Sequence, residues 1–216
     1  GRTQIYIRRW SGTTWEEVGR GSAGGGGVSE SAVGCDAYSQ APLALSGDDT
    51  PYVIWQDDCG NPDIYVRRWN GNTWDEVGTD SASGEGISQT SYYSYDPSLV
   101  FGPHDIPYAV WKDNATTHDG FDIYVRRLSG ESWVEVGAGS ASGTGISSPP
   151  QGSNNHSATI TPDGTPYIAW DEIVDGSRQI YVRRWNGVDW EEVGAGSASG
   201  AGISQTEGVS HNRRIA

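Results

Sequence analysis

The feature that most constrains this chain is a segment that occurs four times. IYIRRW begins at Ile5, and near-copies of it begin at Ile64, Ile123 and Ile180, in steps of 59, 59 and 57 residues. Each copy is followed by a tryptophan, by EVG, and then by a Gly/Ser/Ala stretch whose commonest form is GSASGxGIS. A repeat of this length is one supersecondary unit, which has to stack on its neighbours to bury its faces.

The residue pattern within one repeat predicts four strands. The first is a short apolar segment that begins at Pro42, Pro97 or Ser157, and a Gly/Asp turn leads from it to PYVIW or one of its copies. The third strand is IYVRRW, and a dipeptide such as Asn70-Gly71 folds the fourth strand back as a two-residue hairpin. We expect short inner strands and longer outer ones.

Four-stranded units of about 59 residues predict an all-β fold, and a β-propeller is favoured over a solenoid because solenoid repeats are usually shorter, about 20 to 47 residues. Residues 1–216 would form one propeller or a propeller segment, with three full blades and split terminal strands. The incomplete ends could form one blade together, be completed by more chain, or be completed by a second copy. The units are placed at residues 1–27, 28–86, 87–145, 146–202 and 203–216.

Charge and hydropathy exclude two kinds of partner. The formal net charge is −14 at pH 7, which argues against nucleic acid because phosphate binding needs an excess of Lys and Arg. The chain also contains no apolar run near the roughly 20 residues that a membrane span requires. We therefore expect no nucleic acid partner and no membrane insertion, and we expect an extracellular or cell-surface location.

The only two cysteines, Cys35 and Cys59, lie in one repeat and have no counterparts in the others. Both fall near loops between strands. A disulfide in an oxidising compartment and a pair of free thiols are both open at this point.

An arginine, a tryptophan and a glutamate recur together across the hairpin of every repeat. In a two-residue hairpin, Arg67 would face Trp74 directly and Glu76 diagonally, which favours a structural stack with an ion pair. The alternative is that these groups bind sugar hydroxyls or a carboxylate. The candidate ligand-binding residues are Arg8, Trp15, Glu17, Arg67, Trp74, Glu76, Arg126, Trp133, Glu135, Arg183, Trp190 and Glu192.

The loops after the second strands are rich in carboxylates. Their oxygens could bind Ca²⁺, although none matches an EF-hand spacing, and solvated turn-forming acids are the favoured interpretation. No other cofactor is expected. The acidic residues concerned are Asp57, Asp58, Asp113, Asp171, Glu172 and Asp175.

The hairpin RRWNGNTW resembles the Asp-box turn of sialidase-type propellers, which runs Ser-x-Asp-x-Gly-x-x-Trp. Gly71 and Trp74 match this motif, but Trp69 stands where the Asp should be. The resemblance therefore implies blade architecture and not sialidase chemistry.

The same stretch resembles fucose-binding propeller lectins, in which short chains can oligomerise to complete a ring. That resemblance implies sugar contacts by Arg67, Trp74 and Glu76 and by their counterparts. More broadly, the whole chain resembles the propeller repeats of bacterial exported or surface proteins.

Three functions follow in order of preference. The first is a non-catalytic extracellular scaffold that binds a carbohydrate or a protein surface and self-associates through its incomplete terminal blade. The alternative is a lectin with one shallow site per repeat, and the third is a sialidase-like glycosidase. Because no nucleophile-base pair or zinc motif is found, we expect the chain not to be an enzyme.

Overall fold

The computed structural model describes residues 3–40, 42–114, 120–147 and 152–205. In this part of the chain the one helical element is a 3₁₀ turn, η1 (Pro103–Asp105), and no helix is long and apolar enough to cross a membrane. The strands are β1 (Arg8–Trp10), β2 (Trp15–Glu17), β3 (Asp36–Tyr38), β4 (Leu43–Leu45), β5 (Pro51–Asp58), β6 (Asp63–Trp69), β7 (Trp74–Glu76), β8 (Ser94–Phe101), β9 (Pro107–Asp113), β10 (Asp122–Ser129), β11 (Ser132–Glu135), β12 (Ser153–Ile160), β13 (Pro166–Val174), β14 (Ser177–Trp185) and β15 (Trp190–Glu192).

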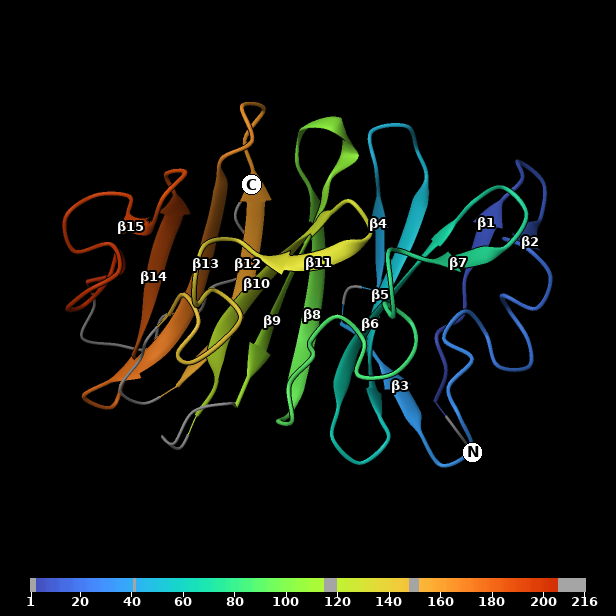
Figure 1. Cartoon of the computed structure of the whole chain (residues 1–216), viewed down its shortest axis with the longest axis horizontal. Helices are drawn as coiled ribbons and strands as arrows, with labels where there is room; N and C mark the ends of the chain where they lie inside the picture. Colours follow the sequence, from blue (N-terminus) through green and yellow to red (C-terminus); the bar gives the residue numbers. More distant parts are fainter. Residues whose placement is uncertain (1–2, 41, 115–119, 148–151, 206–216) are drawn as a thin grey trace. The chain divides into compact units, whose positions relative to one another are not determined.

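The strands form one antiparallel sheet for each repeat, as Figure 1 shows. The first repeat contributes the pair β1-β2. The third and fourth repeats form four-stranded sheets in chain order, β8 to β11 and β12 to β15. In the second repeat the inner strand is divided into β3 and β4, which both pair with β5 before β6 and β7 follow. The predicted all-β class with four-stranded antiparallel sheets is confirmed.

The chain divides into two compact units. Unit 1 comprises residues 1–97 with 130–132, and unit 2 comprises residues 98–129 with 133–216. Val53 and Trp55, which alternate on β5 and so share one face, belong to the core of unit 1. Trp170 and Tyr181 belong to the core of unit 2. A single propeller over residues 1–216 stays a prediction, and the inner strand expected at the C-terminal end falls largely in residues 206–216, outside the described residues.

The predicted widening from short inner strands to longer outer strands is wrong. The outer strands β7 and β15 have three residues each, whereas the inner strands β8 and β12 have eight. The outer strand ends early because the glycine of EVG turns the chain away, as at Gly19, whose φ of 85° favours glycine. The Gly/Ser/Ala loop then takes over the free edge of the third strand, where the amide of Val66 donates to the carbonyl of Ser81.

A buried serine near the start of the Gly/Ser/Ala loop fixes that end of the loop in each repeat. The Ser81 hydroxyl accepts a hydrogen bond from the amide of Val77 at 2.6 Å and donates to the carbonyl of Val66 at 3.0 Å. A tyrosine of the third strand closes the far end, where the Tyr65 hydroxyl donates to the carbonyl of Gly84 at 2.8 Å. The loop therefore has a fixed shape, which the repeated serines and glycines determine. The equivalent serines are Ser22, Ser81, Ser140 and Ser197.

The register of the hairpin also differs from the prediction. Arg67 pairs directly with Glu76, and Trp69 pairs with Trp74, so Arg67 does not face Trp74 across the strands. The connection has four residues, 70–73, because the Asn70 carboxamide oxygen accepts hydrogen bonds from the amides of Asn72 and Thr73, both at 2.8 Å. An asparagine that caps its own turn in this way stabilises the longer loop.

Cys35 and Cys59 form a disulfide, which confirms that alternative. The bond joins the residue before β3 to the residue after β5, at the end of the sheet where these two strands pair. A structural disulfide in a chain of this kind fits an oxidising compartment.

We expect Ser140→Ala to lower the free energy of unfolding by about 1–3 kcal/mol, because the buried amide of Val136 would lose its acceptor. Chemical denaturation followed by tryptophan fluorescence measures the change. The exposed Ser129→Ala is the matched control, expected to stay within about 0.5 kcal/mol of wild type. Equal losses in the two variants would show that the serine hydroxyl does not hold the loop.

Candidate functional site

The recurring tryptophan at the start of the fourth strand joins its repeat to the preceding one. In unit 1, the Trp74 indole nitrogen donates to the carbonyl of Val18 at 2.7 Å. In unit 2, the Trp190 indole nitrogen donates to the carbonyl of Val136, also at 2.7 Å. The same position thus makes the same contact in both units.

The first arginine of each Arg-Arg pair makes a second contact of this kind. Arg67 donates to the carbonyl of Val28 at 3.1 Å and forms an ion pair with Glu30, while Arg183 donates to the carbonyl of Ile146 at 2.7 Å. Burial lowers the pKa of the Arg183 guanidinium. These side chains therefore bind backbone groups of the preceding repeat.

The recurring glutamate organises the loop of its own repeat. Glu192 accepts hydrogen bonds from the Ser199 hydroxyl and from the amides of Gly196 and Ala198, and these bonds lower the pKa of its carboxyl group. Glu135 accepts the corresponding bonds in the third repeat. Both carboxylates are thus occupied by protein donors.

The remaining predicted ligand-binding residues have other surroundings. In the third repeat Trp133 is buried, and burial lowers the pKa of the half-buried Arg126. In the first repeat Arg8, Trp15 and Glu17 are exposed. Ligand binding by this set of residues stays a prediction. For four members of the set, the structure describes a hydrogen bond to the preceding repeat: Arg67, Trp74, Arg183 and Trp190.

The acids proposed as Ca²⁺ ligands have protein partners in the fourth repeat. Asp171 pairs with Arg178 at 2.6 Å, and Glu172 accepts a hydrogen bond from the indole of Trp170. Among the described residues, one group with metal-ligating atoms close together consists of Cys35, Asp57 and Cys59, and its two sulfur atoms are bonded to each other. Ca²⁺ binding stays a prediction.

A groove of about 820 Å³ lies within unit 2, and we call it the arginine groove. The strands β9 and β10 of the third repeat line one side, and the turn at residues 161–165 lines another together with β13 and β14 of the fourth repeat. Its aromatic and charged lining consists of Tyr108, Arg127, Asp163, Tyr167, Arg184 and Trp185.

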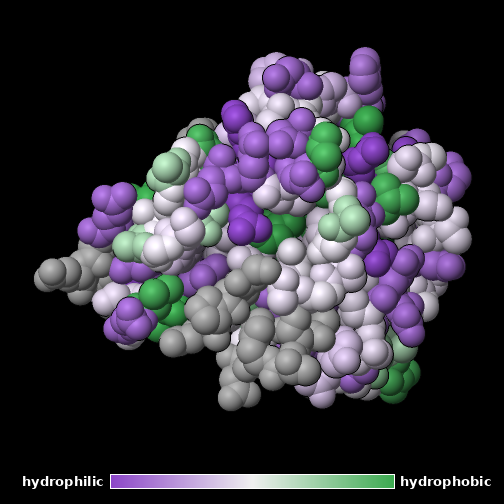
Figure 2. Space-filling view, turned by 60° about the vertical axis from the view of Figure 1, so that its left-hand side comes forward, coloured by the Kyte–Doolittle hydropathy of each residue, from purple (hydrophilic) through white to green (hydrophobic). Residues whose placement is uncertain are grey.

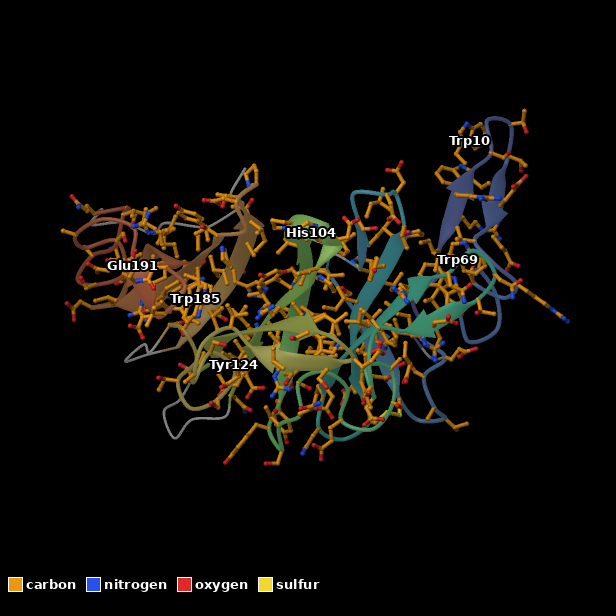
Figure 3. All side chains as sticks on the ribbon, turned by 45° about the horizontal axis from the view of Figure 1, so that its top comes forward. Trp10, Trp69, His104, Tyr124, Trp185 and Glu191 are labelled. Atoms are coloured by element: carbon orange, nitrogen blue, oxygen red, sulfur yellow. A yellow bond between two sulfur atoms is a disulfide. The ribbon has the colours of Figure 1, made fainter. Side chains whose placement is uncertain are left out.

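The two arginines of this groove differ in their partners. Arg184 forms an ion pair with Glu191 at 2.8 Å, and hydrogen bonds to Tyr167 and Glu191 raise the pKa of its guanidinium. Arg127 is half-buried and has no hydrogen bond or ion pair with any residue that the structure describes. Figure 3 shows Trp185 on the strand that carries Arg184, with Glu191 nearby. Arg127 is therefore the cation of the groove that can bind a ligand.

The one carboxylate in the lining of the arginine groove is held in its charged form. The Thr161 hydroxyl and the backbone amide of Thr165 donate to Asp163, and these bonds lower the pKa of its carboxyl group. The groove thus presents a charged acid that already accepts hydrogen bonds within its own turn.

Sequence reasoning missed the residues of this groove because it selected the first arginine of each pair. Alternation along the third strand places the second arginine on the opposite face. A usable signal was present, since the second arginine lies across from the tyrosine of PYxxW, as in the pairs Tyr108–Arg127 and Tyr167–Arg184. The strand pattern could have predicted these neighbours, but not the open space beside them.

No protein-family model and no curated protein matches the chain. Among solved structures, an endo-arabinase from Bacteroides thetaiotaomicron is 14% identical, with a TM-score of 0.42 over 74% of this chain and 61% of its own. An ulvan lyase, which is a polysaccharide lyase, is 14% identical, with a TM-score of 0.48 over 78% of this chain and 44% of its own. A protein of unknown function from Dyadobacter fermentans is 11% identical, with a TM-score of 0.44 over 73% and 41%. This chain spans less than two thirds of each of them, and the likeness assigns it no activity.

We expect Glu172→Gln to stabilise the protein increasingly as pH rises. Burial raises the pKa of Glu172 above its unfolded value of about 4.3, so wild type loses stability as pH rises from that value through the folded pKa. A glutamine keeps the oxygen that accepts from Trp170 and does not ionise. Thermal unfolding across pH 3.5 to 8 measures the difference, with the exposed Glu131→Gln as control. A difference that shrinks with rising pH would contradict the burial argument.

Proposed function

We propose that this chain is a non-catalytic extracellular scaffold that binds a ligand in the arginine groove. The observation that carries the proposal is Arg127, a half-buried guanidinium without a protein partner among the described residues, placed beside Tyr108 in an open groove. A guanidinium in that position favours a ligand with acceptor oxygens, because it presents several N–H donors in a fixed plane.

The carboxylates near the groove support binding without catalysis. Glycoside hydrolysis uses one carboxyl group with a raised pKa as acid, and a second as base or nucleophile. The pKa of Asp163 is lowered by Thr161, and the pKa of Glu191 is lowered by Asn186 and Arg184. Neither group is suited to donate a proton at neutral pH. The disulfide between Cys35 and Cys59 supports an extracellular location.

A lectin is the second candidate function, and the aromatic lining of the groove favours it. Trp185 and Tyr167 offer apolar ring surfaces with polar edges, which suit the faces and hydroxyls of a sugar. Arg127 would pair with a carboxylate on that sugar. In the third repeat Leu128 replaces the tryptophan found at Trp185, so the repeats are not equivalent at this position.

Isothermal titration with trigalacturonate and with uncharged galactotriose tests both candidates. We expect the acidic sugar to bind more tightly, and we expect Arg127→Gln to weaken its binding by about 10- to 100-fold, because a hydrogen-bonded charge contributes about 1.5–3 kcal/mol. Arg9→Gln is the matched control, since Arg9 is exposed and lies in β1.

The outcomes separate the proposals. Reducing ends released during incubation with either sugar would overturn the non-catalytic assignment. Equal binding of both sugars that is unaffected by Arg127→Gln would remove Arg127 from the site. No binding of either sugar would remove the lectin candidate and leave a protein surface as the scaffold's partner.

A further inference from the structure

The second arginine of each pair has an acid opposite it in three repeats, but not in the third. In the other hairpins the two residues are direct partners across the strands, in the pairs Arg9–Glu16, Arg68–Asp75 and Arg184–Glu191. The third repeat has Val134 at the position of these acids, between the recurring Trp133 and Glu135. Of the four hairpins that the structure describes, the one that lacks the acid is therefore the one that carries Arg127.

In the fourth repeat the acid is a fixed partner of the groove arginine. Glu191 accepts a hydrogen bond from Asn186 at 2.7 Å and one from the Nε of Arg184 at 2.9 Å. The bond from Asn186, followed by the bond from Arg184, lowers the pKa of the Glu191 carboxyl group. The carboxylate therefore stays charged and compensates the charge of Arg184.

The third repeat lacks both members of this arrangement. Ser129 stands at the position of Asn186, and Val134 stands at the position of Glu191. Val134 is half-buried on β11, the neighbour of the strand β10 that carries Arg127, and its aliphatic side chain accepts no hydrogen bond. The sequence change thus accounts for a guanidinium that has no partner among the described residues.

We propose that Val134 sets the charge preference of the arginine groove, because a valine at this position leaves the Arg127 guanidinium to a carboxylate of the ligand. Glu191 occupies Arg184 at the same time, so the groove takes one anionic group and not two. An acid at position 134 would occupy Arg127 as Glu191 occupies Arg184. The inference deepens the proposed function and rests on it, since it concerns the same groove.

A half-buried guanidinium gains more from a carboxylate than a fully solvated one does. Burial has already removed part of the water around Arg127, and a carboxylate can accept two parallel hydrogen bonds from its planar donors. On the face that Figure 2 draws, the described apolar residues form small separate groups among hydrophilic ones. A ligand on that face therefore meets no broad apolar surface, and polar and charged contacts decide its affinity.

Isothermal titration with trigalacturonate and galactotriose tests the inference on variants of two matched positions. We expect Val134→Glu to weaken binding of the acidic sugar by at least about tenfold and to leave galactotriose binding unchanged, because the new carboxylate pairs with Arg127. Val134→Gln has nearly the same size without the charge and should keep the preference for the acidic sugar. Glu191→Val frees Arg184 and should strengthen trigalacturonate binding by about three- to tenfold.

Two controls separate this effect from misfolding and from net charge. Thermal unfolding of Val134→Glu should match that of wild type, because the fourth repeat already carries a glutamate at this position beside an arginine. Val33→Glu adds the same charge at a site that is 85% exposed in unit 1 and outside the lining of the groove. This variant should bind both sugars like wild type.

Arginine modification gives a second measurement that needs no sugar. p-Hydroxyphenylglyoxal reacts with the deprotonated guanidine, and a carboxylate partner favours the protonated form. Peptide mass spectrometry should find Arg127 modified in wild type and protected in Val134→Glu. Arg184, whose pKa is raised by hydrogen bonds to Tyr167 and Glu191, should be protected in wild type and modified in Glu191→Val.

The two measurements separate failure of this inference from failure of the proposed function. Trigalacturonate binding that is equal in wild type and Val134→Glu would overturn the role of Val134, as would equal losses in Val134→Glu and Val134→Gln. If wild type binds neither sugar, the acidic-sugar ligand is wrong, and the modification of Arg127 decides the role of Val134. Protection of Arg127 in Val134→Glu would then support that role, and unchanged reactivity would overturn it.

Discussion

The stacking of these repeats depends on backbone carbonyls that need a donor where two sheets meet. The carbonyl of Val18 receives the indole of Trp74, and the carbonyl of Val136 receives that of Trp190, each at 2.7 Å. A buried carbonyl without a partner would cost free energy, so the tryptophan supplies apolar area and the required donor from one side chain. The valine is itself positioned by the buried serine of its loop. One repeat therefore prepares the surface on which the next one packs.

Successive side chains on a strand point to opposite faces, so the two arginines of each pair make different contacts. Arg183 faces the preceding repeat and binds its backbone, whereas Arg184 lies across from Tyr167 and lines a groove. The charge of the side chain does not distinguish these two roles, because arginine fills both of them at neighbouring positions. The ligand chemistry proposed for this chain thus depends on the second arginine, while the first maintains the interface.

The repeats are nearly identical in sequence but not in surroundings, and their possible functions come from that difference. The same tryptophan position is 59% exposed at Trp15 and 5% exposed at Trp133. Ligand binding would use the side of the sheets that stacking leaves open.

The sequence by itself determined the repeat and the strand-forming segments within it, because strand periodicity and turn residues are local properties. It left a disulfide and two free thiols open for Cys35 and Cys59, and the structure decided for the disulfide. It did not determine the hairpin register, since the side chain of Asn70 decided that the loop has four residues. The groove residues, including Arg127, also escaped prediction. The open space of the groove, and a guanidinium without a partner among the described residues, arise only where two sheets meet, so the tertiary structure alone decided them.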